Sequence, residues 1–86
     1  MRLGRKYIWF DSYKEFEEFI QKHGLETWNV INVYYGVTGG TIYKGDARIG
    51  KFRVYTRGKN EGKVKVYSPY LYKVLRGNQN EDSKDN

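Results

Sequence analysis

The sequence contains no cysteine, a single proline and a single histidine, and it has no long hydrophobic run. Without cysteine it can form neither a disulfide nor a thiolate metal site, and one histidine does not make an ordinary zinc site. No apolar stretch approaches the roughly 20 residues that cross a membrane. The basic N-terminus is not followed by the hydrophobic segment of a secretory signal. We therefore expect a cytoplasmic protein with no membrane contact, no metal and no cofactor.

The chain is short and unusually rich in aromatic side chains. Its 86 residues suit one domain, and they include nine Tyr, four Phe and two Trp as material for the core. Residues 77–86 contain no apolar side chain, a composition that predicts a disordered polar tail. Residues 1–76 are then left to fold as a single α+β domain, close to the smallest size that packing alone stabilises.

The first third of the chain predicts a strand followed by a helix. Residues 6–10 (KYIWF) are aromatic and β-branched, which favours a strand. Ser12 and Glu15 have the spacing of a capping box, and apolar side chains then recur at three- and four-residue steps. With Gly24 as the stop, the pattern predicts a helix over residues 12–23, packed on one face of a sheet.

The rest of the chain predicts a mostly antiparallel sheet of four to five strands in total. Four further strand segments are rich in β-branched and aromatic residues: 28–37, 41–44, 48–57 and 63–68. Gly39 and Gly40 favour a hairpin turn over residues 38–40. The Ser68-Pro69 pair and Gly77 predict a short C-terminal helix over residues 69–76, with a further strand as the alternative.

The net charge of +6 is unevenly distributed along the chain. Residues 11–26 carry five acids against two lysines, and residues 27–43 carry no charge. Residues 44–76 carry ten bases against two acids. Positive charge is therefore concentrated in the C-terminal half of the fold.

Side chains alternate strictly in segments 48–57 and 63–68. Phe52, Val54, Thr56, Val64, Val66 and Ser68 fall on one side of the two strands, because side chains of a strand repeat every second residue. The other side carries Lys51, Arg53, Tyr55, Arg57, Lys63, Lys65 and Tyr67. If Ile42 is buried and Val37 points inward, Tyr34 and Tyr43 extend the same surface.

A basic, tyrosine-bearing sheet face is typical of a nucleic-acid-binding surface. Lysine and arginine neutralise phosphates and release counterions, and exposed rings stack on unpaired bases. The same hairpin could enter a duplex groove as a β-ribbon, so the pattern leaves open DNA or RNA, single-stranded or double-stranded. Basic residues on a solvated strand also keep a protein soluble, which is the structural explanation of the same pattern.

Other features favour a structural role. The glycines of residues 36–40 could form an anion nest, but a hairpin turn explains them better. His23 falls in the last helical turn, where packing or the helix C-terminus explains it. We expect Trp9 and Trp28 in the core or at its margin, with base stacking as an alternative for Trp28.

No arrangement of side chains typical of nucleophilic or metal catalysis can be assembled, and we expect no enzymatic activity. Residues 46–55 (DARIGKFRVY) nevertheless resemble the central hairpin of RelE-type toxins, which are metal-independent ribonucleases. The resemblance implies RNA-cleavage candidates: Arg48, Arg53, Tyr55 and Lys65. That family places two helices between its first strands, whereas one helix fits between Phe10 and Trp28.

The main alternative to nucleic-acid binding is a protein–protein interaction module, such as a phage or viral inhibitor of a host complex. The acidic helix could engage a basic partner, and an exposed edge strand could support a homodimer.

Overall fold

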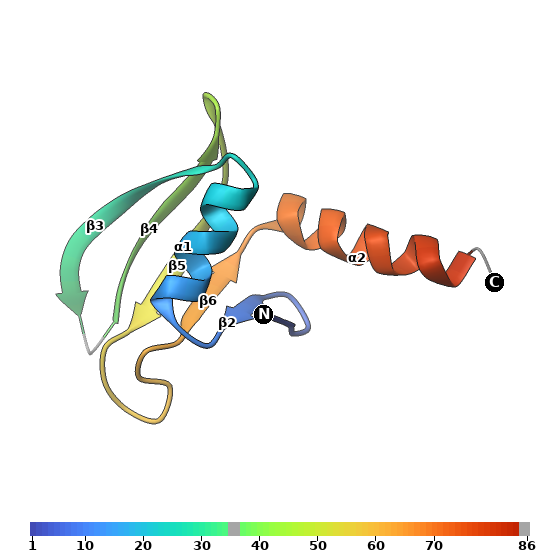
Figure 1. Cartoon of the computed structure of the whole chain (residues 1–86). Helices are drawn as coiled ribbons and strands as arrows, with labels where there is room; N and C mark the ends of the chain where they lie inside the picture. Colours follow the sequence, from blue (N-terminus) through green and yellow to red (C-terminus); the bar gives the residue numbers. More distant parts are fainter. Residues whose placement is uncertain (35–36, 85–86) are drawn as a thin grey trace.

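The computed structural model describes the backbone of residues 1–34 and 37–84 and the side chains of residues 1–29 and 37–77. The strands are β1 (Arg2–Leu3), β2 (Ile8–Phe10), β3 (Glu26–Tyr34), β4 (Val37–Lys44), β5 (Ala47–Tyr55) and β6 (Val64–Tyr67); the helices are α1 (Tyr13–Lys22) and α2 (Pro69–Lys84) (Figure 1). Within the described residues, the strands form one six-stranded antiparallel sheet in the order β1-β2-β6-β5-β4-β3. The predicted α+β class is confirmed.

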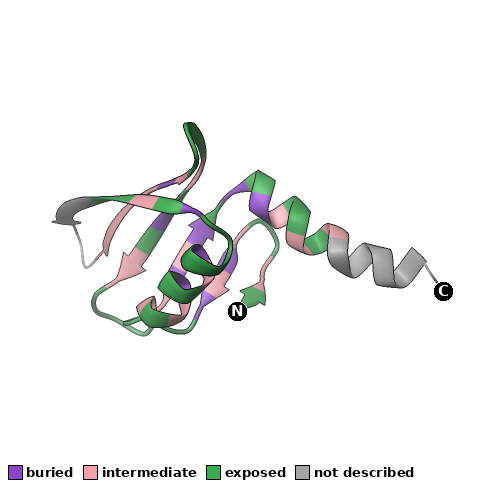
Figure 2. Ribbon diagram, turned by 45° about the horizontal axis from the view of Figure 1, so that its top comes forward, coloured by how far each residue is buried: buried purple, intermediate pink, exposed green. Residues whose placement is uncertain are grey.

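Helix α1 lies across one face of the sheet, and the core fills the space between them (Figures 1 and 2). Phe16 of α1 is 1% exposed, and its ring lies 4.8 Å from that of Phe52 in β5 and 5.5 Å from that of Phe10 in β2 (centroid to centroid). Buried aliphatic side chains complete the cluster: Ile8, Ile20, Leu25, Ile42, Val64, Val66 and Leu71. We call this side of the sheet the inner face.

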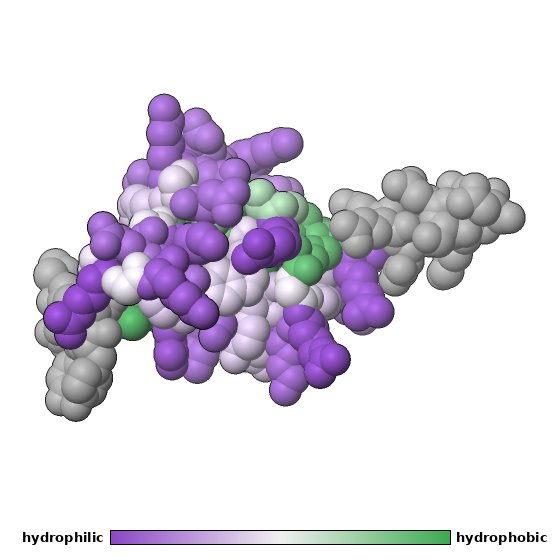
Figure 3. Space-filling model, turned by 90° about the horizontal axis from the view of Figure 1, so that it is seen from below, coloured by the Kyte–Doolittle hydropathy of each residue, from purple (hydrophilic) through white to green (hydrophobic). Residues whose placement is uncertain are grey.

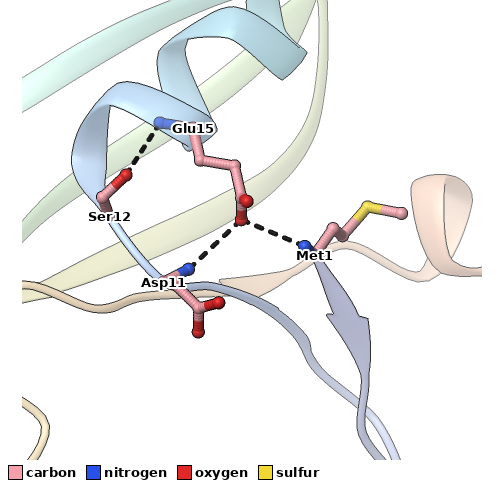
Figure 4. Close-up of polar contacts among 4 residues, drawn as sticks. All are labelled: Met1, Asp11, Ser12 and Glu15. Atoms are coloured by element: carbon pink, nitrogen blue, oxygen red, sulfur yellow. Dashed lines mark hydrogen bonds and ion pairs between the residues drawn. The ribbon is translucent and has the colours of Figure 1, made fainter.

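The predicted signals set both ends of α1. Ser12 Oγ accepts a hydrogen bond from the Glu15 backbone N–H (3.1 Å), and Gly24 has φ of +65° just beyond the helix. The Glu15 carboxylate does not bond back to the Ser12 backbone N–H, which would be the second contact of a capping box. It accepts hydrogen bonds from the Asp11 N–H (3.2 Å) and from the Met1 amine (3.0 Å), which ties the N-terminus to the helix (Figure 4).

These contacts make a pH-dependent contribution to the stability of the fold, which a substitution can test. The Met1 amine, and then the Asp11 N–H, hold the pKa of Glu15 below its usual value of 4.5. A lowered folded-state pKa stabilises the fold above the unfolded-state pKa, and this stabilisation is lost as the pH falls through the folded-state value. We expect Glu15→Gln to be slightly less stable than wild type near about pH 7, with the difference vanishing at about pH 2.

Urea unfolding at both pH values measures this difference, and the effect is small because the ion pair is solvent-exposed. Glu18→Gln is the matched control, because Glu18 is an exposed carboxylate of the same helix with no hydrogen-bond partner in the described part of the chain. A Glu15→Gln deficit of equal size at both pH values would contradict the assignment.

The structure corrects the predicted course of β3 and β4. Residues 38–40 do not form the predicted turn, because β4 begins at Val37 and runs through both glycines. Val37 pairs with Tyr55 on the side away from α1, instead of pointing inward. A Cβ on Gly39 would collide with the Phe52 carbonyl oxygen, and one on Gly40 with that of Trp28. These glycines therefore allow close approach of neighbouring backbones within the sheet.

The two ends of the fold extend beyond the prediction. β1, a strand of two residues that pairs with β2, was not predicted. Helix α2 follows buried Ser68, whose Oγ donates to the Ile49 carbonyl (2.6 Å) and accepts from the Leu71 N–H (3.1 Å). It then leads away from the sheet (Figure 1) and reaches Lys84, so it is longer than the predicted 69–76 and includes residues expected in a disordered tail.

Candidate nucleic-acid interface

Strand pairing assembles a surface on the side of the sheet opposite α1. Lys51 lies opposite Tyr67, and Arg53 lies opposite Lys65, in the β5–β6 pair. β2 on the other side of β6 places Trp9 opposite Lys65. We call this surface the outer face and define it by its residues: Tyr7, Trp9, Lys51, Arg53, Tyr55, Lys65 and Tyr67.

The predicted alternation is confirmed at the centre of the hairpin and ends where the strands end. Phe52, Val64, Val66 and Ser68 are buried, while Lys51, Arg53 and Tyr67 are exposed. β5 stops at Tyr55, so Arg57 lies in the connecting loop, and Thr56, expected to point inward, is exposed there as well. Lys63 precedes β6. Its carbonyl accepts a hydrogen bond from the Tyr55 N–H (3.0 Å) at the end of the hairpin next to the connecting loop.

Aromatic rings on the outer face are in contact across strands. The rings of Trp9 and Tyr55 are stacked, with centroids 6.0 Å apart and planes 16° from parallel. Those of Tyr7 and Tyr67 are 5.8 Å apart. Sequence reasoning missed Tyr7 and Trp9 as members of this surface. Residues 7–10 are all aromatic or aliphatic, so the alternation is visible only in the structure, where Ile8 and Phe10 are buried and Tyr7 and Trp9 lie on the other side of the sheet.

Lysine ammonium groups lie over these rings. Lys65 Nζ is 4.0 Å from the ring centroid of Tyr7 and 5.6 Å from that of Trp9, and Lys51 Nζ is 5.8 Å from that of Tyr67. Such contacts at exposed sites are worth about 0.5–1 kcal/mol each. They hold the ammonium groups beside the rings, and they are weak enough for a phosphate to compete for the charge.

The cations of the outer face are not neutralised by any acidic side chain that the structure describes. In the described part of the structure, Lys51, Arg53 and Lys65 have no ion-pair partner. The acidic side chains Glu17 and Glu18 are exposed on α1, which covers the inner face, so they lie on the opposite side of the domain. The sheet therefore separates these carboxylates from the cations of the outer face.

The outer face is hollowed beside Tyr67. A depression of about 290 Å³ is bounded by Lys6, Tyr7, Lys51, Phe52, Arg53, Lys65 and Tyr67. A second, of about 350 Å³, continues from Lys51 and Tyr67 toward Thr41 and Arg48. No acidic side chain is among the described residues that line either one. A phosphate would meet only positive charge in both.

Trp28 lies outside the core, so the expectation that it belongs to the core or its margin is wrong. Its side chain is 72% exposed, on the same side of the sheet as Thr41, its partner in β4. The ring of Tyr43 lies 6.5 Å away at 65° to the indole, and Ile42 is fully buried, as the prediction for Tyr43 required. The side chain of Tyr34, predicted to extend this surface, lies outside the described residues.

The residues singled out for other reasons are dispersed. The four residues of the RelE-type resemblance do not converge: Arg53, Tyr55 and Lys65 are neighbours, whereas Arg48 lies five residues back along β5, roughly 16 Å away. One helix, α1, separates β2 from β3. His23 is exposed at the C-cap of α1, where its ring contacts that of Phe19 (4.3 Å), as packing at the helix end predicts.

Comparison with protein-family models, with curated proteins and with solved structures finds no match to this chain. In the described part of the chain, no helix is long and apolar enough to cross a membrane, and no group of three or more acidic or histidine side chains could hold a metal ion.

Proposed function

We propose that this protein binds nucleic acid with little base-sequence specificity, through the outer face. The observation that carries the proposal is the register of β2, β5 and β6, which places cations with no ion-pair partner among the described residues beside aromatic rings on one side of the sheet. Lys51, Arg53 and Lys65 would contact phosphates, while Tyr55 and Tyr67 would offer rings to bases. Arg57 and Lys63 lie at the end of the hairpin next to the connecting loop and would add positive charge.

The chemistry of these groups favours general affinity over sequence readout. Phosphate contacts by flexible cations carry no base information, and every base offers a face to an aromatic ring. The outer face, as defined above, contains no Asn or Gln, the side chains that read adenine edges bidentately. DNA and RNA present the same phosphates and similar base faces, so the proposal covers both; the 2′-hydroxyl is what would separate them.

A salt titration tests the proposal. Fluorescence anisotropy with labelled single- and double-stranded DNA and RNA, in several salt concentrations, should show affinity that falls linearly on a log–log plot. The slope should be about −2 or steeper for three phosphate contacts, because each contact contributes about −0.7 on single strands and about −0.9 on duplex DNA. Failure to bind any of the four nucleic acids at low salt would overturn the proposal.

A double variant separates stacking from charge in the same assay. Tyr55→Ala with Tyr67→Ala removes two rings of the outer face and leaves all its cations in place. We expect weaker binding to single strands with an unchanged salt slope, because the number of phosphate contacts is preserved. A changed slope with unchanged affinity for single strands would contradict a stacking role for these tyrosines.

A protein-binding function is the second candidate, and one surface favours it. Hydrophobic side chains are exposed where α2 leaves the domain: Met1 (51%), Tyr70 (42%) and Val74 (40%). Figure 3 shows a hydrophobic area at this place on an otherwise hydrophilic side. If this surface binds a protein partner, Val74→Asp should abolish capture of that partner from the native host. Charge reversal at Lys65 should leave the capture unchanged.

A further inference from the structure

The indole of Trp28 is exposed at a position where nothing in the fold requires a tryptophan. It is 72% exposed near the start of β3, an edge strand of the sheet. Its contact with Tyr43 is edge-to-face, at 65° between the planes, so the ring is steadied from the side. Tryptophan is enriched at binding surfaces, because its large ring is apolar on its faces and carries an N–H that can remain in water.

Trp28 lies on the same row of the sheet as the cations of the outer face. The registers of three strand pairs place Tyr67, Lys51, Thr41 and Trp28 side by side across β6, β5, β4 and β3. With strands about 4.8 Å apart, Trp28 and Tyr67 are separated by roughly 14 Å along the sheet. The depression lined by Thr41, Arg48, Lys51 and Tyr67 occupies this interval.

We propose that Trp28, steadied by Tyr43, is a second base-stacking position that makes this surface selective for single-stranded nucleic acid. The inference rests on the function proposed above and specifies its ligand. A strand that stacks one base on Tyr67 and a later base on Trp28 would carry the intervening phosphates past Lys51 and Arg48. The interval of roughly 14 Å is a few nucleotides long, because one DNA strand rises about 3.4 Å per nucleotide in a duplex and more when it is extended.

The selectivity follows from which base faces are accessible. In a duplex each base is stacked between its neighbours, and only edges and phosphates are exposed to a protein surface. In a single strand a base can leave its neighbours and stack on a side chain. The cations therefore bind the phosphates of both forms, whereas Trp28 stacks on bases of the single strand alone.

The test compares Trp28→Leu, which keeps apolar bulk and removes the ring, with Trp28→Phe, which keeps a ring. Each is titrated with a labelled oligothymidine of about 12 nucleotides, and with a hairpin duplex of the same phosphate number. Trp28→Leu should weaken single-strand binding by about 5- to 150-fold and leave duplex binding within about twofold. Trp28→Phe should recover part of the loss. Tyr70→Leu removes an exposed ring on α2 and should change neither.

The possible failures are distinguishable. If wild type binds neither ligand, both the proposed function and this site are overturned. If wild type binds but Trp28→Leu does not weaken single-strand binding, or weakens both ligands equally, only the Trp28 site is overturned. A change in the sedimentation mass of the free protein, with binding unaffected, would instead assign the ring to contact between copies. Unchanged circular dichroism and melting temperature show that the variants are folded.

Discussion

Replacing Lys51, Arg53 and Lys65 together by glutamine is expected to lower affinity for single-stranded nucleic acid by about 10²- to 10³-fold at about 50 mM salt. With a log–log slope of about −0.7 per phosphate, each contact contributes about eightfold at this salt relative to about 1 M. Three contacts multiply to about 500-fold, and the slope itself should become shallower by about 2. Anisotropy titration of both proteins across a salt series measures both quantities.

The control for this variant must change the net charge equally without touching the outer face. Lys14 and Lys22 are exposed on α1, and Lys73 is exposed on α2. Their triple glutamine variant should keep most of the affinity and nearly the wild-type slope, because it alters the long-range field and removes no phosphate contact. Equal losses in the two triple variants would show that only total charge matters, and would contradict a defined interface.

Phe16→Ala is expected to cost about 3–5 kcal/mol of folding free energy, a large part of what a domain of this size has. The ring is 1% exposed and packs between Phe10 and Phe52, so its loss leaves a cavity behind the centre of the sheet. The urea midpoint, with the slope of the transition fixed, measures the loss. Phe16→Leu keeps most of the volume and should cost about 1.5 kcal/mol or less.

The same substitution connects the core to the interface. Phe52 packs against Phe16 on the inner face, and its neighbours Lys51 and Arg53 project from the outer face. Nucleic-acid affinity of the Phe16→Ala variant should therefore fall in proportion to its unfolded fraction and recover at low temperature or on added ligand. An Ala variant as stable as wild type would contradict the central place of this ring in the core.

The parts of the fold that the sequence predicted are those decided by local signals. Ser12 and Gly24 define α1 because capping depends on residues within one turn. The hairpin of β5 and β6 was predictable because apolar and basic residues alternate without ambiguity, which fixes the register. On the charged side of that alternation, sequence and structure agree that Lys51, Arg53 and Lys65 lie on the same side of the sheet.

The parts that were missed depend on contacts between distant segments. Nearly every residue from Tyr7 to Phe10 is apolar, so only the pairing of β2 with β6 decides that Trp9 faces outward. Gly39 and Gly40 have the composition of a turn, and only the closeness of the Phe52 and Trp28 carbonyls shows why a strand needs them. Arg57 was predicted within β5 because the alternation continues past Tyr55, where the hydrogen-bonded ladder stops.

Chemical-shift mapping by NMR tests the central claim most directly, because it reports both whether nucleic acid binds and where. Amide spectra of the isotope-labelled protein would be recorded during titration with an unlabelled oligothymidine of about 12 nucleotides at low salt. We predict shifts at Trp9, Lys51, Arg53, Lys65 and Tyr67, with the amides of α1 nearly unchanged. Shifts confined to α1 or α2, or no shifts at all, would contradict the assignment of the outer face as a nucleic-acid interface.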